Sequence, residues 1–355
     1  MNKERDVRMD FARMILAFLV IAIHSDLSWL DAVPTARAFV VSTLFTTDGA
    51  FFTLSGYFLL NRELSTPQDY GNYYLKRFIS VIFPWLIMHL ILDVIFNRFI
   101  YAIGFEAYIK AFVKNLLVND YYSYLWFMYA FIPIILCAPF FAKMLTHMAK
   151  FELVILACLT IAFLLFVEAI SHAGLAFVFS DFMIGGFTIY FLLGHYLRRF
   201  SEEIRRFRFL FYIAGIIGLI LVARATIVLD TVPGTLLGKP YYMVFVFALI
   251  IFLTSIPVEK CKVIAVVSKF VARHAFSIYL THTYMIDRVD KLLEPIYVRL
   301  DLNFPLVVKN GVYYVFHILA AVAFAFLYDE LIIFRLQDLL RFLFSRRKAR
   351  IQKAD

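Results

Sequence analysis

The first long apolar segment of the chain carries three ionisable residues, Asp10, Arg13 and His24. Eleven residues lead from Arg13 to His24, and at 100° per residue the two side chains are about 20° apart around a helix. They therefore point the same way, about 16 Å apart along the axis, and Asp10 shares their face. Because ionisable side chains inside a membrane are costly and usually functional, this face is a candidate site.

Arg13 and His24 offer two kinds of chemistry. A guanidinium suits a phosphorylated ligand, because its planar fork matches phosphate oxygens. A histidine ordinarily titrates close to neutral pH and suits the removal of a proton from an alcohol. The structural alternative pairs Arg13 with Asp10 and leaves His24 hydrogen-bonded to a neighbouring helix. The residues themselves leave both interpretations open.

The composition places this face in a membrane. Hydrophobic residues make up 63% of the 355 residues and charged residues only 17%, whereas a soluble domain averages about 45–50% and about 25%. This balance excludes a water-soluble globule, and 41 Phe and 21 Tyr exclude a disordered chain. A spanning helix needs about 20 mostly apolar residues. Ten such segments fit the sequence: 9–29, 37–60, 74–96, 124–145, 152–170, 179–197, 207–223, 241–257, 264–286 and 312–334.

We therefore predict an all-α integral membrane protein, a bundle of about ten transmembrane helices. With the N-terminus in the cytoplasm, the cytoplasmic loops and tail hold more than twice as many Lys and Arg as the opposite side, so both termini are predicted to be cytoplasmic. The same bias accounts for the net charge of +9 without nucleic acid as a partner. No loop reaches domain size, so residues 1–355 are predicted to form one transmembrane domain with a basic cytoplasmic tail at 336–355.

The predicted second span carries two further candidates. Asp48 lies just before Gly49, where a helix break is expected, and it either orients His24 or pairs with a neighbour. Ser55 precedes Gly56, and small residues of this kind allow two helices to approach closely. Packing is therefore the first interpretation of Ser55, and lining a tunnel is the second.

Five more candidates lie in later spans. Lys76 and Arg77 are expected at the inner membrane edge, where they either bind a phosphate or only set the topology. Trp126 is expected near the outer interface, where it either stacks on a sugar or belongs to an ordinary aromatic belt. His282 lies deep in a marginal span beside Tyr279, and it either takes part in the chemistry or links two helices.

The sequence predicts neither a metal site nor a disulfide framework. No histidines are paired at helical spacing, and the three cysteines, at 137, 158 and 261, have no close spacing. His274 is expected near a loop.

Five segments, in order along the chain, resemble the signature blocks of the membrane-bound acyltransferase 3 family. The first is Arg8-Met-Asp-Phe-Ala-Arg13, followed after ten residues by His24. The others are FFTLSGYFL at 51–59, LWFM at 125–128, FLLGHYLR at 191–198 and SIYLTH at 277–282. Their order and the spacing from Arg13 to His24 carry the resemblance.

The resemblance implies transfer of an acyl group, commonly acetyl, from cytoplasmic acyl-CoA to a hydroxyl of a cell-surface glycan or its lipid-linked precursor. His24 matches the essential histidine of the family and acts as general base, and Arg13 matches its partner in the acyl-CoA tunnel. The implied donor is acetyl-CoA, the implied partners are membrane lipids and a glycan acceptor, and the implied location is the bacterial plasma (inner) membrane.

One departure from the family pattern affects the expected CoA contacts. The family often carries Arg-x-x-Arg ahead of a proline at the start of the third span, whereas here Lys76 and Arg77 are followed by Ser80, Val81 and Pro84. This departure indicates a small, single-domain subgroup that is similar to surface-polysaccharide O-acetyltransferases.

Two rival functions stay open at this point. One is a transporter or exporter of a glycan or lipid-linked intermediate, in which the buried charges line a path. The other is a non-catalytic membrane subunit, in which Arg13 and Asp10 form a structural pair.

Overall fold

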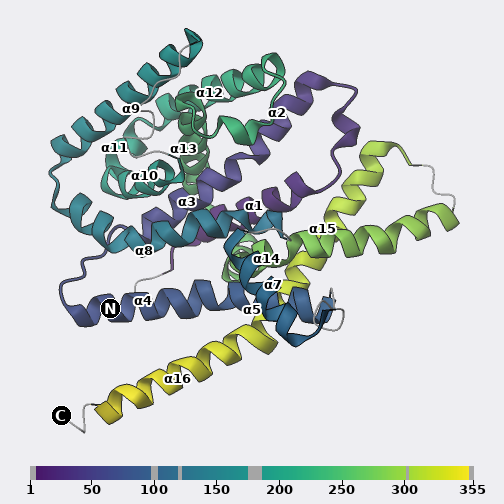
Figure 1. Ribbon diagram of the computed structural model, residues 1–355. Helices are drawn as coiled ribbons and strands as arrows, with labels where there is room; N and C mark the ends of the chain where they lie inside the picture. Colours follow the sequence, from purple (N-terminus) through teal and green to yellow (C-terminus); the bar gives the residue numbers. More distant parts are fainter. Residues whose placement is uncertain (1–4, 97–102, 119–121, 175–185, 301–303, 352–355) are drawn as a thin grey trace. The chain divides into compact units, whose positions relative to one another are not determined.

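A computed structural model describes residues 5–96, 103–118, 122–174, 186–300 and 304–351 of the chain (Figure 1). Every regular element among these residues is a helix, and no strand occurs in them. The all-α prediction is therefore confirmed.

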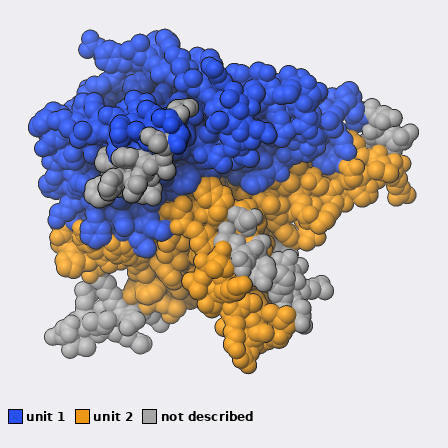
Figure 2. Space-filling view, turned by 45° about the horizontal axis from the view of Figure 1, so that its top comes forward, with its two compact units in different colours: residues 1–64, 133–273, 302–314 blue, residues 65–132, 274–301, 315–355 orange. Residues whose placement is uncertain are grey.

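The chain divides into two compact units, which Figure 2 colours separately. Unit 1 consists of residues 1–64, 133–273 and 302–314, and unit 2 consists of residues 65–132, 274–301 and 315–355.

Unit 1 contains the first helix and most of the helices whose ribbons are teal or green in Figure 1. Its complete helices are α1 (Val7–His24), α2 (Pro34–Leu44), α3 (Thr46–Leu59), α9 (Lys150–His172), α10 (Phe187–Arg199), α11 (Ser201–Arg206), α12 (Arg208–Val228) and α13 (Pro240–Ser255). Helix α3 is central to this unit, because it contacts α1, α2, α10 and α13.

The crossing of α3 and α10 depends on two glycines. A Cβ atom on Gly56 would lie 1.8 Å from the backbone oxygen of Phe191, and one on Gly194 would lie 2.2 Å from the backbone oxygen of Thr53. Backbone atoms cannot move aside as a flexible side chain can, so only glycine permits this approach. The packing interpretation of the Ser55 and Gly56 pair is therefore the one that this crossing supports.

The predicted second span, 37–60, is interrupted at a different residue from the one expected. The break lies at Phe45, between α2 and α3, and Gly49 is inside α3. The prediction of a break at Gly49 is wrong, because this glycine makes room for a ring instead: a Cβ atom there would lie 2.7 Å from Tyr190.

Unit 2 contains α4 (Pro67–Arg77), α5 (Phe83–Ile91), α7 (Phe105–Val118) and α16 (Phe334–Ile351). Three helices run from one unit into the other: α8 (Trp126–His147), α14 (Lys262–Arg299) and α15 (Leu306–Tyr328). Short π-helical stretches lie at Phe78–Ile82, Leu92–Phe96 and Asp329–Ile333. The first has a simple cause, because Pro84 has no N–H to give to Ser80 and its ring crowds that carbonyl group.

Eight helices in the described part of the chain are long and apolar enough to span a membrane. They are Pro34–Leu59, Pro67–Val94, Trp126–His147, Lys150–Ser171, Arg208–Val228, Pro240–Lys260, Lys262–Arg299 and Leu306–Ser345. Helix α1 is not among them, since it carries Arg8, Asp10 and Arg13 within 18 residues, and the described part of α10 is only 13 residues long. The protein is thus a multi-pass membrane protein, and the count of ten spans stays a prediction.

Candidate functional site

The predicted site residues fall into both units. Unit 1 holds Arg13, His24, Asp48 and Ser55, and unit 2 holds Lys76, Arg77, Trp126, Tyr279 and His282.

The acidic residue of α1 is paired, but not with Arg13. Asp10 is buried, with 2% of its surface exposed. Arg5 donates two hydrogen bonds to its carboxylate, from Nε at 2.5 Å and from a terminal nitrogen at 3.1 Å. The same terminal nitrogen donates to the backbone oxygen of Lys269 at 3.0 Å. The structural alternative, in which Asp10 is the hydrogen-bonded partner of Arg13, is therefore not what this helix adopts.

The guanidinium of Arg13 lies over the ring of Phe58, 4.4 Å from its centre. Among the described residues, Arg13 forms no hydrogen bond or ion pair within contact distance. Asp10 lies close enough to interact electrostatically with it. A cation held by an aromatic face, with its N–H groups uncommitted to described residues, is suited to an anionic ligand.

His24 is the last residue of α1, and its side chain is exposed. The predicted span 9–29 is thus shorter as a helix, because the chain turns at Ser25 and Asp26. Ser28 donates from its backbone N–H and its hydroxyl to Asp26, at 2.9 and 2.8 Å, and Asn310 donates to the same carboxylate at 3.1 Å. Partial burial raises the pKa of Asp26, but these hydrogen bonds outweigh it and the pKa is lowered overall.

Asp48 lies in the first turn of α3 and is half-buried. Two fully buried tyrosines, Tyr190 and Tyr242, lie near enough to interact electrostatically with it. Their hydroxyls donate elsewhere, to the backbone oxygens of Leu237 at 2.6 Å and Ser42 at 2.7 Å. Asp48 itself has no hydrogen bond or ion pair with any described residue.

His24 and Asp48 lie on the same side of the contact between Arg13 and Phe58. Arg13 stacks on Phe58, so the start of α1 lies beside the end of α3. Helix α1 also contacts α2, which precedes α3, and the two helices therefore run antiparallel. From Arg13 to His24, and from Phe58 back to Asp48, the chain rises about 15–16 Å in the same direction.

The two basic candidates of unit 2, Lys76 and Arg77, end α4. Lys76 is exposed, and the guanidinium of Arg77 lies 5.5 Å from the centre of the Tyr73 ring. Thr66 and Asp69 cap the other end of the helix. Positive charge at the C-terminal end of a helix is favoured by the helix dipole.

The three remaining candidates form part of an aromatic cluster in unit 2. Trp126 begins α8 and is 38% exposed. The hydroxyl of Tyr279 donates to the backbone oxygen of Tyr124 at 3.1 Å. His282 is fully buried, with Nδ1 2.7 Å from the Tyr279 backbone oxygen and Nε2 3.1 Å from the Thr283 hydroxyl. Both ring nitrogens are thus engaged within its own helix, which favours a structural role.

Comparison with protein families shows to which family the chain belongs. An acyltransferase domain model matches residues 6–330. The chain belongs to the acyltransferase 3 family. The resemblance drawn from the sequence blocks is confirmed, and the protein is a membrane acyltransferase. Comparison with curated proteins and with solved structures gives no match.

This acyltransferase contains a buried polar cluster that the sequence did not predict. His274 lies in the middle of α14, 1% exposed, with Nδ1 2.6 Å from a carboxylate oxygen of Asp329. Ser277 donates to the other oxygen of that carboxylate at 2.5 Å. The expectation of a loop near His274 is wrong, because α14 continues without a break for 38 residues. In the sequence, the one indication of this cluster is that His274 and Ser277 are one helical turn apart.

Proposed function

We propose that this acyltransferase moves an acetyl group from acetyl-CoA to a hydroxyl of a cell-surface polysaccharide or its lipid-linked precursor. The observation that carries the proposal is the state of Arg13. Asp10, the nearest acidic residue of its own helix, accepts hydrogen bonds from Arg5 instead. The guanidinium therefore keeps its donors for an anionic ligand, and the phosphates of CoA supply that charge.

His24 is the proposed general base. It takes the proton of the acceptor hydroxyl while the hydroxyl oxygen attacks the thioester carbonyl. The bond from the carbonyl carbon to sulfur then breaks, and the proton passes from His24 to the CoA thiolate. The products are an O-acetyl ester and the free thiol of CoA.

Asp48 is the proposed companion of His24. It lies on the same side of the contact between Arg13 and Phe58 as His24 does, and a carboxylate without a described partner stabilises an imidazolium by its charge. Within unit 2, we assign Lys76 and Arg77 to phosphate binding, and Trp126 and Tyr279 to binding of the acceptor, because aromatic rings and polar groups are the side chains that bind sugars. These assignments follow from the family membership and from residue type.

The proposed orientation has both termini in the cytoplasm of a bacterial cell, with the chain in the inner membrane. The excess of Lys and Arg on the side of the termini supports it. In this orientation Arg13 lies towards the cytoplasm, which is the side that supplies acetyl-CoA.

A turnover assay tests the proposed function. Purified full-length protein in detergent is incubated with radiolabelled acetyl-CoA, and release of CoA and labelling of added polysaccharide are measured. We expect the protein to consume acetyl-CoA. If it neither binds nor consumes acetyl-CoA while remaining folded, the transferase proposal fails and transport of a glycan becomes the working function.

Replacement of Arg13 with Gln tests the assigned anion contact. We expect the Kd for acetyl-CoA to rise about 10- to 100-fold, because a hydrogen bond to a charged group contributes about 1.5–3 kcal/mol. Isothermal titration calorimetry in detergent gives the value. Arg37→Gln is the matched control, since Arg37 is an exposed arginine ion-paired with Asp31. Equal affinities for the two variants would show that Arg13 does not contact the donor.

A further inference from the structure

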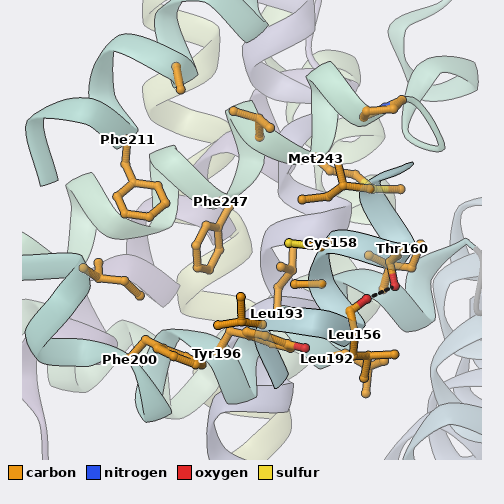
Figure 3. Close-up of a pocket in the computed structure, with 18 of the residues that line it drawn as sticks. Leu156, Cys158, Thr160, Leu192, Leu193, Tyr196, Phe200, Phe211, Met243 and Phe247 are labelled. Atoms are coloured by element: carbon orange, nitrogen blue, oxygen red, sulfur yellow. Dashed lines mark hydrogen bonds between the residues drawn. The ribbon is translucent and has the colours of Figure 1, made fainter. Parts of the chain in front are cut away.

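Unit 1 contains a groove that none of the proposed catalytic residues lines. It has a volume of about 660 Å³ and lies among α9, α10, α11, α12 and α13 (Figure 3). The rings of Phe211 and Phe247 line one part of it, and those of Tyr196 and Phe200 another. The groove is partly open, because lining residues such as Leu210 and Val244 are 62% and 41% exposed.

The two hydroxyl groups that line the groove, those of Thr160 and Tyr196, are already hydrogen-bonded within the protein. The hydroxyl of Thr160 donates to the backbone oxygen of Leu156 at 2.8 Å, as drawn in Figure 3. The hydroxyl of Tyr196 donates to the backbone oxygen of Leu153 at 2.8 Å. A sugar or a phosphate inside the groove would therefore find few hydrogen-bond partners, whereas a hydrocarbon chain needs none.

One end of the groove is strongly basic. Helix α11 directs Ile204 into the groove and exposes Arg205 and Arg206. Among the described residues, Glu203 is the one carboxylate that lines the groove, and it is ion-paired with Lys150 at 2.5 Å. Further basic residues of this turn are Arg198 and Arg199, which end α10, and Arg208, which begins α12, against one more acid, Glu202.

We propose that this groove binds the acyl chains of an anionic phospholipid, whose phosphate lies at Arg205 and Arg206. The hydrocarbon fits a lining made almost entirely of apolar side chains, and the negative headgroup fits the surplus of arginines at the end where Ile204 and Phe207 close the groove. A guanidinium pair at the membrane surface attracts anionic lipid over neutral lipid. The lipid is held beside α10, the helix that packs on α3 through Gly56 and Gly194.

Native mass spectrometry tests the proposal. Full-length protein is exchanged into detergent with equal amounts of phosphatidylglycerol and phosphatidylcholine that carry the same acyl chains, and retained lipid is counted. We expect the wild type to retain phosphatidylglycerol about tenfold more than phosphatidylcholine. Arg205→Gln with Arg206→Gln should remove this preference, and both residues are exposed, so the double variant should fold. Equal retention of the two lipids by the wild type would overturn the proposal.

A pair of alanines in α9 tests the position of the acyl chains. Ala157 lines the groove, whereas Ala162 is exposed on the same helix outside it. Ala157→Trp should abolish retention of phosphatidylglycerol, and Ala162→Trp should retain it as the wild type does. If a folded Ala157→Trp variant, with the melting temperature of Ala162→Trp, still retains the lipid, the chains do not occupy this groove.

Discussion

Replacement of His24 with Ala is expected to lower the rate of acetyl transfer about 10²–10⁴-fold, which is the usual contribution of a general base. The acceptor hydroxyl is a weak nucleophile until its proton is removed, and no other histidine lies on α1. The affinity for acetyl-CoA should change little, because Arg13 is about 16 Å away along the helix axis. The rate is measured with radiolabelled acetyl-CoA under conditions that saturate the enzyme.

His147→Ala is the matched control for this experiment. His147 also ends a helix, α8, and is exposed, and its Nδ1 is 2.8 Å from the backbone oxygen of Lys143. We expect this variant to keep the wild-type rate. A His24→Ala enzyme that transfers acetyl at the same rate as His147→Ala would exclude the proposed base and leave direct attack by another group.

Replacement of Gly56 with Val is expected to prevent stable folding. Even a Cβ atom would overlap the Phe191 backbone oxygen at 1.8 Å, so α3 and α10 must separate. Overpacking of a close-packed contact lowers the free energy of unfolding by about 1–3 kcal/mol when side chains can adjust. Here the contact is between the backbones of two helices, which adjust less, so the loss is expected to be larger. The expected result is a melting temperature in detergent far below that of the wild type, or protein that elutes as aggregate in size-exclusion chromatography.

Gly311→Ala is the matched control for the helix crossing. Gly311 is an exposed glycine inside α15, and no atom lies within 4 Å of its added Cβ. Alanine there should stabilise the helix by about 1 kcal/mol. A Gly56→Val protein that melts at the wild-type temperature would contradict the close approach of α3 and α10.

The ionisable face of α1 was predictable because it depends on local periodicity alone. The spacing of Arg13 and His24 gives their common direction once the segment is a helix, and the apolar runs give the other helices. The family resemblance likewise rested on short blocks with a fixed order. These parts of the structure need no information about which distant residues meet.

Contacts between distant residues are what the sequence could not provide. Asp10 lies three residues before Arg13 and was an obvious partner for it, yet Arg5 reaches the carboxylate from outside the helix. His274 and Asp329 meet across 55 positions of sequence. Gly49 carried the usual signal of a break, but its function is to accept the ring of Tyr190, a residue 141 positions further along.

The pairing of Arg5 with Asp10 has a consequence for how this enzyme is handled. The counter-ion of a buried carboxylate comes from the segment that precedes α1, and that segment is also tethered to the Lys269 backbone oxygen. A shortened protein without Arg5 would leave Asp10 to recruit the next cation on its face, which is Arg13. Truncation at the amino end would then occupy the anion site from within, so protein prepared for functional work should keep Arg5.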